Sequence, residues 1–195
     1  LSESGESLNN SKGLLSITTP WPSMLRDIWN DTDRFKEVYW SKFDTYFAGD
    51  GAIIDADNDI CVIGRVDDVL NVAGHRIGTM EVESALVDHP SVAEAAVIGI
   101  PDDIKGEAIA AFVILKTDAT ESADLIAELK QHVSQQISPI AKPSLLVCTP
   151  DLPKTRSGKI MRRILKQLVA NETIGDTTTL ASPDILDIIK EKLSE

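Results

Sequence analysis

The sequence predicts a mixed α/β (α+β) fold, in which a β-rich first third is followed by a small domain with a short sheet flanked by helices. Three observations support this class: apolar runs around turn-forming residues near the beginning, two apolar runs typical of buried strands in the middle, and helical spacing of apolar residues around them. A chain of 195 residues is long enough for one ordinary domain, or for a small domain plus part of another.

The elements of the first third follow from its turns and apolar runs. Polar residues open the chain, two prolines end the first apolar run, and an acidic turn separates two later runs. In chain order we expect a loop, a strand, a helix leading into an extended stretch, and a β-hairpin, over residues 1–12, 14–18, 31–47 and 52–63.

The second part alternates helical and strand patterns. We expect buried strands over residues 95–100 and 108–115, and helices around residues 82–86, 125–133 and 160–168. Ser182 followed by Pro183 is a typical helix start, so a short helix is expected in the tail. The alternation predicts a small α/β domain.

Composition excludes several classes of function. The formal net charge of −12 argues against binding to nucleic acid or to an anionic membrane, because both need a broad positive field. No apolar stretch of about 18 residues is present, and residues 1–7 do not resemble a signal peptide, so we expect a cytoplasmic protein and no membrane partner. Cys61 and Cys148 lack neighbouring metal ligands and are expected to be buried free thiols in strands. The absent initiator Met indicates a processed, truncated or excerpted chain.

Four clusters of residues could carry chemistry, and each also has an ordinary structural interpretation. Asp50 lies between two glycines, as in a turn that presents a carboxylate. Residues 64–78 mix glycines, charges and aliphatic residues, as in an ordered hinge or a linker. His89 precedes a proline, which is typical of a helix-ending turn more than of a metal ligand.

The fourth cluster is a basic segment in an acidic chain. Six Lys or Arg residues lie between Lys154 and Lys166, and Gly158 before Lys159 would let this amine project from a loop at a helix start. Such a group suits stabilisation of negative charge on a phosphate or carboxylate. The alternative is a solvated basic helix end, and the segment lacks the glycine spacing of a Walker A loop.

Taken in this order, the clusters resemble the adenylate-forming superfamily, and most closely its acetate-activating members, the acetyl-CoA synthetases. The motifs that carry the resemblance are Gly49-Asp50, Gly64-Arg65-Val66-Asp67-Asp68, Gly74-His75-Arg76 and the run from Pro153 to Lys159, with Pro20-Trp21-Pro22 upstream and Gly175-Asp176-Thr177-Thr178-Thr179-Leu180 downstream. The resemblance implies that residues 1–66 are the end of a large AMP-binding N-terminal domain. Residues 67–195 would be the mobile C-terminal lid domain.

The resemblance also implies a two-step reaction. Acetate attacks the α-phosphate of ATP to give acetyl-adenylate and pyrophosphate, and CoA then displaces AMP to give acetyl-CoA. Lys159 would stabilise the first transition state as a fixed cation. Asp50 and Arg65 would bind the ribose and Arg76 the phosphate, while the lid would rotate about Asp67 between the steps.

The same resemblance assigns further ligands and marks two departures. Ala73 and Gly74 would line the CoA tunnel, and Mg²⁺ would accompany ATP. A cation would lie near Val87, His89 and Val92, with backbone carbonyls and the imidazole as its ligands. Ala73 replaces a serine that these enzymes usually carry. Residues 134–139 lack an arginine expected to meet the 3′-phosphate of CoA.

Two alternatives stay open. A propionate-preferring ligase would share these motifs, because the acyl pocket and the phosphate-binding loop belong to sequence upstream. A non-catalytic module would present Lys159 to a protein acetyltransferase and a deacetylase. In either case residues 1–195 alone are expected to be inactive, and residues 1–66 are expected to fold poorly without a parent domain.

Overall fold

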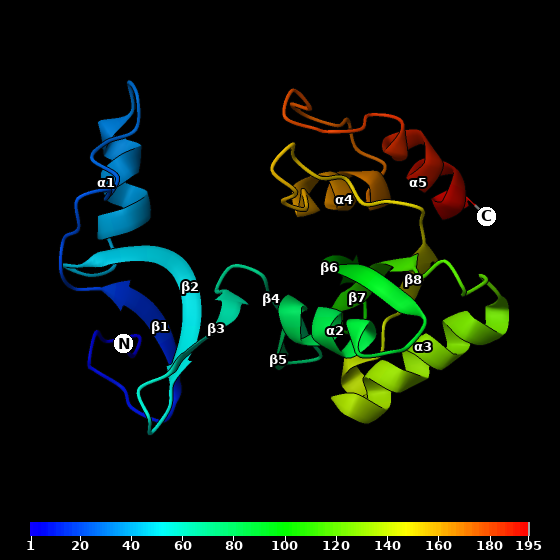
Figure 1. The fold of residues 1–195 in the computed structure, drawn as a ribbon, viewed down its shortest axis with the longest axis horizontal. Coiled ribbons are helices and arrows are strands. Elements are labelled where there is room, and N and C mark those ends of the chain that lie inside the picture. The colour runs from blue at the N-terminus through cyan, green and yellow to red at the C-terminus, as the bar shows by residue number, and fades with distance from the viewer. Residues whose placement is uncertain (195) are drawn as a thin grey trace. The chain divides into compact units, whose positions relative to one another are not determined.

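A computed structural model of the chain describes residues 1–194 and divides into two compact units, Leu1–Asp68 and Val69 onward. The division lies two residues after the boundary expected from the sequence. Each unit is described by itself below (Figure 1).

The first unit is a three-stranded antiparallel sheet with one helix. Its strands are β1 (Lys12–Ile17), β2 (Tyr46–Ile54) and β3 (Ile60–Arg65), in the order β1-β2-β3, and its helix is α1 (Thr32–Trp40). The Asp31 side chain caps α1 by accepting a hydrogen bond from the Arg34 amide. The predicted strand, helix and hairpin all form in this unit.

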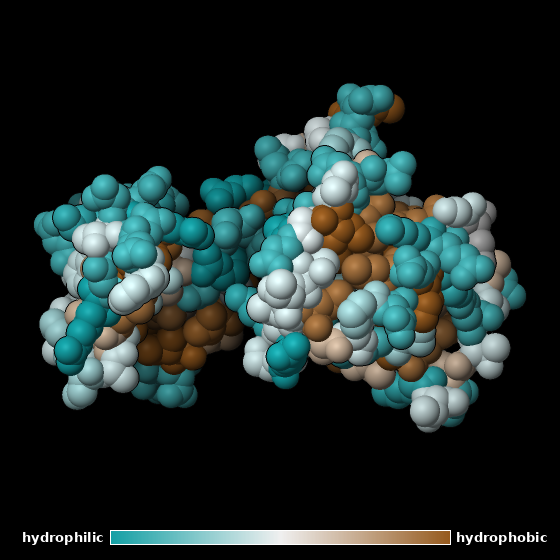
Figure 2. All heavy atoms as spheres, turned by 90° about the horizontal axis from the view of Figure 1, so that it is seen from above, coloured by the Kyte–Doolittle hydropathy of each residue, from teal (hydrophilic) through white to brown (hydrophobic). Residues whose placement is uncertain are grey.

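The apolar residues of β3 are largely uncovered. Ile60 and Val62 are 59% and 48% exposed, and Figure 2 shows apolar surface on this unit. Cys61 is also exposed, so the expectation of a buried thiol was wrong for this residue. The physical reason is that β3 is an edge strand with a single neighbour, and the unit supplies little to cover it.

The second unit has a five-stranded sheet with helices on both faces. Its strands are β4 (Val69–Val72), β5 (His75–Gly78), β6 (Val92–Asp102), β7 (Gly106–Leu115) and β8 (Leu145–Cys148). Its helices are α2 (Thr79–Val87), α3 (Ala123–Gln136), the short 3₁₀ helix η1 (Pro139–Ala141), α4 (Arg162–Val169) and α5 (Ile185–Ser194). The strand order is β5-β4-β7-β6, and β8 lies parallel to β7.

The period-two alternation of β6 and β7 supplies both faces of the core. Val97 and Ala111 face α2 and α3, whereas Ile98 and Phe112 face α4 and α5, and all four side chains are fully buried. Figure 1 shows the two helix pairs on opposite sides of the sheet. The predicted α/β (α+β) class, with helices flanking a short sheet, is confirmed.

The sequence interpretation missed one hairpin. β4 and β5 pair across a two-residue turn, Ala73-Gly74, within the segment interpreted only as an ordered hinge. Both turn residues have positive φ, 51° and 83°, as a type I′ hairpin turn requires. Cys148 is buried in β8, as expected. Among residues 1–194, no helix is long and apolar enough to cross a membrane.

Candidate functional site

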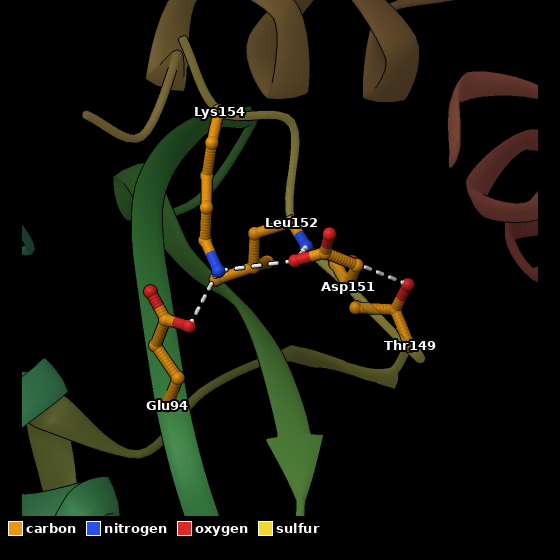
Figure 3. Close-up of polar contacts among 5 residues, drawn as sticks. All are labelled: Glu94, Thr149, Asp151, Leu152 and Lys154. Atoms are coloured by element: carbon orange, nitrogen blue, oxygen red, sulfur yellow. Dashed lines mark hydrogen bonds and ion pairs between the residues drawn. The ribbon is translucent and has the colours of Figure 1, made fainter. Parts of the chain in front are cut away.

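The basic segment begins on a rigid base directly after β8. The Thr149 hydroxyl donates to the Asp151 carbonyl (2.8 Å), and the Leu152 amide donates to the Asp151 carboxylate (2.7 Å). The Lys154 ammonium lies between two carboxylates, 2.7 Å from Glu94 on β6 and 3.0 Å from Asp151 (Figure 3). Burial lowers the pKa of Lys154, but its hydrogen bonds to Glu94 and Asp151 outweigh this effect and raise it.

Residues 153–161, which we name the lysine loop, fold back on themselves beyond this base. The Thr155 amide donates to the Lys159 carbonyl (2.8 Å), and the Lys159 amide donates to the Thr155 hydroxyl (3.1 Å). Gly158 closes the turn with φ of 84°, a conformation that favours glycine. The turn therefore fixes the backbone of Lys159 and leaves its side chain exposed.

The far end of the lysine loop is fixed by a partly buried ion pair. Arg162, the first residue of α4, donates to both carboxylate oxygens of Glu83 on α2, at 2.7 and 2.8 Å. The side chains are 24% and 13% exposed, so water screens this pair less than it screens a surface pair. The same carboxylate accepts the amide of Val97 on the edge strand β6 (2.8 Å).

The six basic residues of the segment therefore have different roles. Lys154 and Arg162 form ion pairs, and Arg163 donates to the Asp176 carbonyl (2.7 Å) and to Gln167 (3.0 Å). Within residues 1–194, the side chains of Arg156, Lys159 and Lys166 have no hydrogen-bond or ion-pair partner, and all three are exposed. Lys159 alone of these three follows a closed turn.

A second group of predicted residues lies together in the first unit. Asp50 and Arg65 are directly paired across β2 and β3, with the guanidinium 3.9 Å from the Asp50 carboxylate. Arg65 also donates to Asp67 (2.9 and 3.3 Å) and to the Ala48 carbonyl. Gly49 has φ of 84°, which favours glycine, and a Cβ there would lie 2.7 Å from the Arg65 guanidinium and displace it.

The predicted CoA and phosphate residues lie on the β4–β5 hairpin of the second unit. The Ala73 amide donates to the Lys105 carbonyl (2.8 Å), which connects the turn to the β6–β7 hairpin. Gly74 has open space around it, and Arg76 is exposed on β5. The turn backbone is thus both fixed and accessible.

The residues predicted to bind a cation surround the end of α2. His89 is 6% exposed; its Nδ1 accepts the Ser91 amide (3.3 Å), and its Nε2 lies 3.4 Å from Glu128. Because Nδ1 accepts, Nε2 carries the hydrogen and donates to Glu128. Both ring nitrogens are therefore occupied, so the imidazole does not fit as a ligand here, and only oxygens such as backbone carbonyls could serve. Over residues 1–194, no group of three or more His, Cys, Asp or Glu side chains could hold a metal ion.

Sequence reasoning did not find the carboxylates that hold the lysine loop. Glu83 and Glu94 lie 79 and 60 positions from their partners Arg162 and Lys154. No local pattern distinguishes them from other acidic residues in an acidic chain. The buried side of α2, on which Glu83 lies next to Val82, was the only available signal.

Part of the second unit matches a known protein family, and the fold is similar to several solved structures. Residues 81–159, which include Glu83 and the lysine loop as far as Lys159, match the family described as the AMP-binding enzyme C-terminal domain. In solved structures, the fold is similar to acetoacetyl-CoA synthetase from Streptomyces lividans, with a TM-score of 0.80 and 26% identity over 99% of this chain and 30% of that one. It is also similar to the anthranilate CoA ligase AuaEII in complex with anthranoyl-AMP, with a TM-score of 0.71 and 30% identity over 85% of this chain and 32% of that one. Residues 81–159 are thus similar to the C-terminal domain of AMP-binding enzymes, and the fold as a whole is similar to that of two CoA ligases or synthetases.

The sequence relatives are more specific. The chain is 56% identical over 192 residues to the acetyl-coenzyme A synthetase of Streptomyces coelicolor, covering 98% of this chain and 30% of the relative. It is 58% identical over 184 residues to that of Gemmatimonas aurantiaca, covering 92% of this chain and 28% of the relative. The predicted resemblance to acetyl-CoA synthetases is confirmed, and the chain spans about 30% of the length of the first of these relatives.

Proposed function

We propose that this chain is part of an acetate-CoA ligase, which converts acetate, ATP and CoA into acetyl-CoA, AMP and diphosphate through acetyl-adenylate. The observation that carries the proposal is the identity of more than half with acetyl-coenzyme A synthetases along nearly the whole chain. In this proposal residues 1–66 belong to the large AMP-binding domain, and residues 67–195 are the lid. Because the acyl pocket lies elsewhere, propionate is the alternative substrate.

Lys159 is the proposed catalytic residue of the adenylation step. Negative charge develops on the phosphate oxygens as the acetate carboxylate attacks the α-phosphate and pyrophosphate leaves. A preorganised cation stabilises this charge without reorganisation during the reaction. The closed turn of the lysine loop and the exposed ammonium support this role, which is electrostatic and transfers no proton.

Asp50 and Arg65 are the proposed ribose ligands, and Asp67 is the proposed pivot of the lid. The 3.9 Å approach of the Arg65 guanidinium to the Asp50 carboxylate supports a shared site, because the two groups lie close enough to contact the same ribose. Asp67 lies one residue before the last residue of the first unit, where a change of backbone angles would move one unit as a whole.

The β4–β5 hairpin is the proposed CoA and phosphate contact. Ala73 and Gly74 would line the CoA tunnel through backbone groups, and Arg76 would bind the phosphate. Mg²⁺, when bound with ATP, would screen the phosphate charges. Val87, His89 and Val92 are kept as a cation site whose ligands are backbone oxygens.

A second candidate role rests on the exposure of the Lys159 side chain at the end of its turn. A protein acetyltransferase could modify this ammonium and a deacetylase restore it, and acetylation would remove the charge that adenylation needs. We propose that the ligase itself acts in the cytoplasm. If the chain were only such a module, it would be acetylated at Lys159 without ever supporting ligase activity.

The test measures the two half-reactions of the full-length protein separately. Lys159→Ala should slow acetate-dependent ATP–pyrophosphate exchange by about a hundredfold or more, the usual effect of removing one such charge-stabilising group. Thioester formation from supplied acetyl-adenylate should be retained. Lys166→Ala removes another exposed, unpartnered lysine and is the matched control. Normal adenylation by Lys159→Ala would refute the assignment.

A further inference from the structure

The segment that follows α4 lies against the lysine loop and contributes no strand to the five-stranded sheet. We name residues 175–181 the tail segment. Thr155 and Leu180 form an antiparallel bridge, the Arg156 amide donates to the Thr179 carbonyl (3.2 Å), and the Ala181 amide donates to the Lys154 carbonyl (2.9 Å). The tail segment therefore pairs with the strand-like residues that lead to Lys159.

This pairing adds a third strand to the lysine loop and so makes its conformation more stable. Lys154 also bridges to Ile160, so residues 154–160 by themselves form a minimal two-stranded hairpin. An isolated two-stranded hairpin is marginally stable in water, whereas a third strand makes such an arrangement more persistent. The tail segment supplies the backbone of that third strand on the side opposite Ile160.

The tail segment is itself fixed at both ends. Leu180 is 5% exposed and packs in the core with Leu165 and Phe112. At the other end the Arg163 guanidinium donates to the Asp176 carbonyl (2.7 Å), and a Cβ on Gly175 would lie 2.7 Å from the same guanidinium.

Residues 176–180 form a turn that is stabilised by one hydrogen bond to a side chain and one between backbone groups. The Asp176 carboxylate accepts the Thr178 amide (2.9 Å), and the Leu180 amide donates to the Thr177 carbonyl (2.9 Å). The tail segment thus reaches the lysine loop in one defined conformation.

We propose that the tail segment is a positioning element for Lys159, so that Asp176 and Ala181 act on the adenylation step through the lysine loop without touching substrate. The inference rests on the proposed function, because it assumes that the Lys159 ammonium acts in adenylation. Small displacements of a reacting group reduce rate steeply, by up to about a hundredfold for 1 Å. A looser tail segment should therefore slow the step that uses Lys159 and spare the step that does not.

The experiment uses the full-length protein and three tail-segment variants. Asp176→Ala removes the acceptor of the Thr178 amide, Asp176→Asn keeps an oxygen in its place, and Ala181→Pro removes the amide that donates to Lys154. Asp55→Ala is the matched control, because Asp55 accepts two amides in a similar turn of the first unit.

We expect Asp176→Ala and Ala181→Pro to lower the rate constant of adenylation by about tenfold, with thioester formation from supplied acetyl-adenylate unchanged. Asp176→Asn and Asp55→Ala should behave as the wild type. The inference is overturned if both disruptive variants adenylate normally while Lys159→Ala does not. It is also overturned if both half-reactions fall together, since this would indicate a general loss of folding. Normal adenylation by Lys159→Ala would instead refute the proposed function itself.

Discussion

Replacement of Glu83 by alanine should destabilise the second unit although Glu83 has no proposed contact with substrate. Its carboxylate accepts a hydrogen bond from the Val97 amide at the edge of the sheet, and both of its oxygens accept hydrogen bonds from the Arg162 guanidinium. β6 has a strand neighbour only on its β7 side, so the alanine variant leaves the amide of the fully buried Val97 without an acceptor.

The expected cost can be worked out from these contacts. An unsatisfied buried amide costs about 1–3 kcal/mol, and hydrogen bonds to a charged group contribute about 1.5–3 kcal/mol. The Arg162 side chain is 24% exposed and can recover part of its loss by hydration. We therefore expect Glu83→Ala to lower the free energy of unfolding by about 3 kcal/mol, and Glu83→Gln by about 1 kcal/mol, because the amide oxygen still accepts from Val97.

Hydrogen exchange of the Val97 amide in the full-length protein is the direct assay. A loss of about 3 kcal/mol should accelerate exchange roughly a hundredfold if the amide exchanges through unfolding of the unit. Glu191→Ala, at an exposed position of α5, is the control. The reasoning fails if Glu83→Ala and Glu191→Ala exchange equally fast at Val97.

Two further predictions concern the cysteines and the base of the lysine loop. Burial, with a smaller contribution from Glu121, raises the pKa of Cys148 to about 11, whereas Cys61 is exposed. An alkylating reagent at pH 8 should therefore label Cys61 quickly and Cys148 only after denaturation. Equal labelling of the two cysteines, read by mass spectrometry, would contradict this. Burial raises the pKa of Asp151, but the hydrogen bonds from Lys154 and from the Leu152 amide, together with the Lys154 charge, outweigh this and lower it. The stabilisation is therefore present above the ordinary carboxyl pKa of about 4 and is lost as pH falls through the lowered value. Lys154→Met should therefore lose less stability than the wild type between about pH 5 and pH 3. The difference should be under about 1 kcal/mol, because the Asp151 side chain is 48% exposed and water screens its ion pair; parallel curves of unfolding free energy against pH would refute this.

The sequence predicted most of the elements because their patterns are local. The alternation through β6 and β7 and the spacing of Leu129 and Val133 on α3 each specify a buried face without reference to the rest of the chain. The lysine loop was also predictable, since Gly158 permits the positive φ of its turn.

The missed features depend on tertiary structure. The β4–β5 hairpin joins two strands of four residues, which are too short for a strong alternating signal, although Gly74 after the run Val69–Val72 could have indicated a turn. Cys61 has apolar neighbours in sequence, but burial depends on what covers an edge strand, which its own sequence does not encode.

The basic segment shows most clearly why composition alone misassigns roles. Six positive residues in an acidic chain suggested one anion-binding cluster, yet Lys154 and Arg162 are paired with carboxylates from β6 and α2. These pairs fix the two ends of the lysine loop, and a cation must be fixed beforehand to stabilise a transition state more than a ground state. Loss of a paired residue should therefore reduce stability and adenylation together, whereas loss of the unpartnered Lys159 ammonium should reduce adenylation alone.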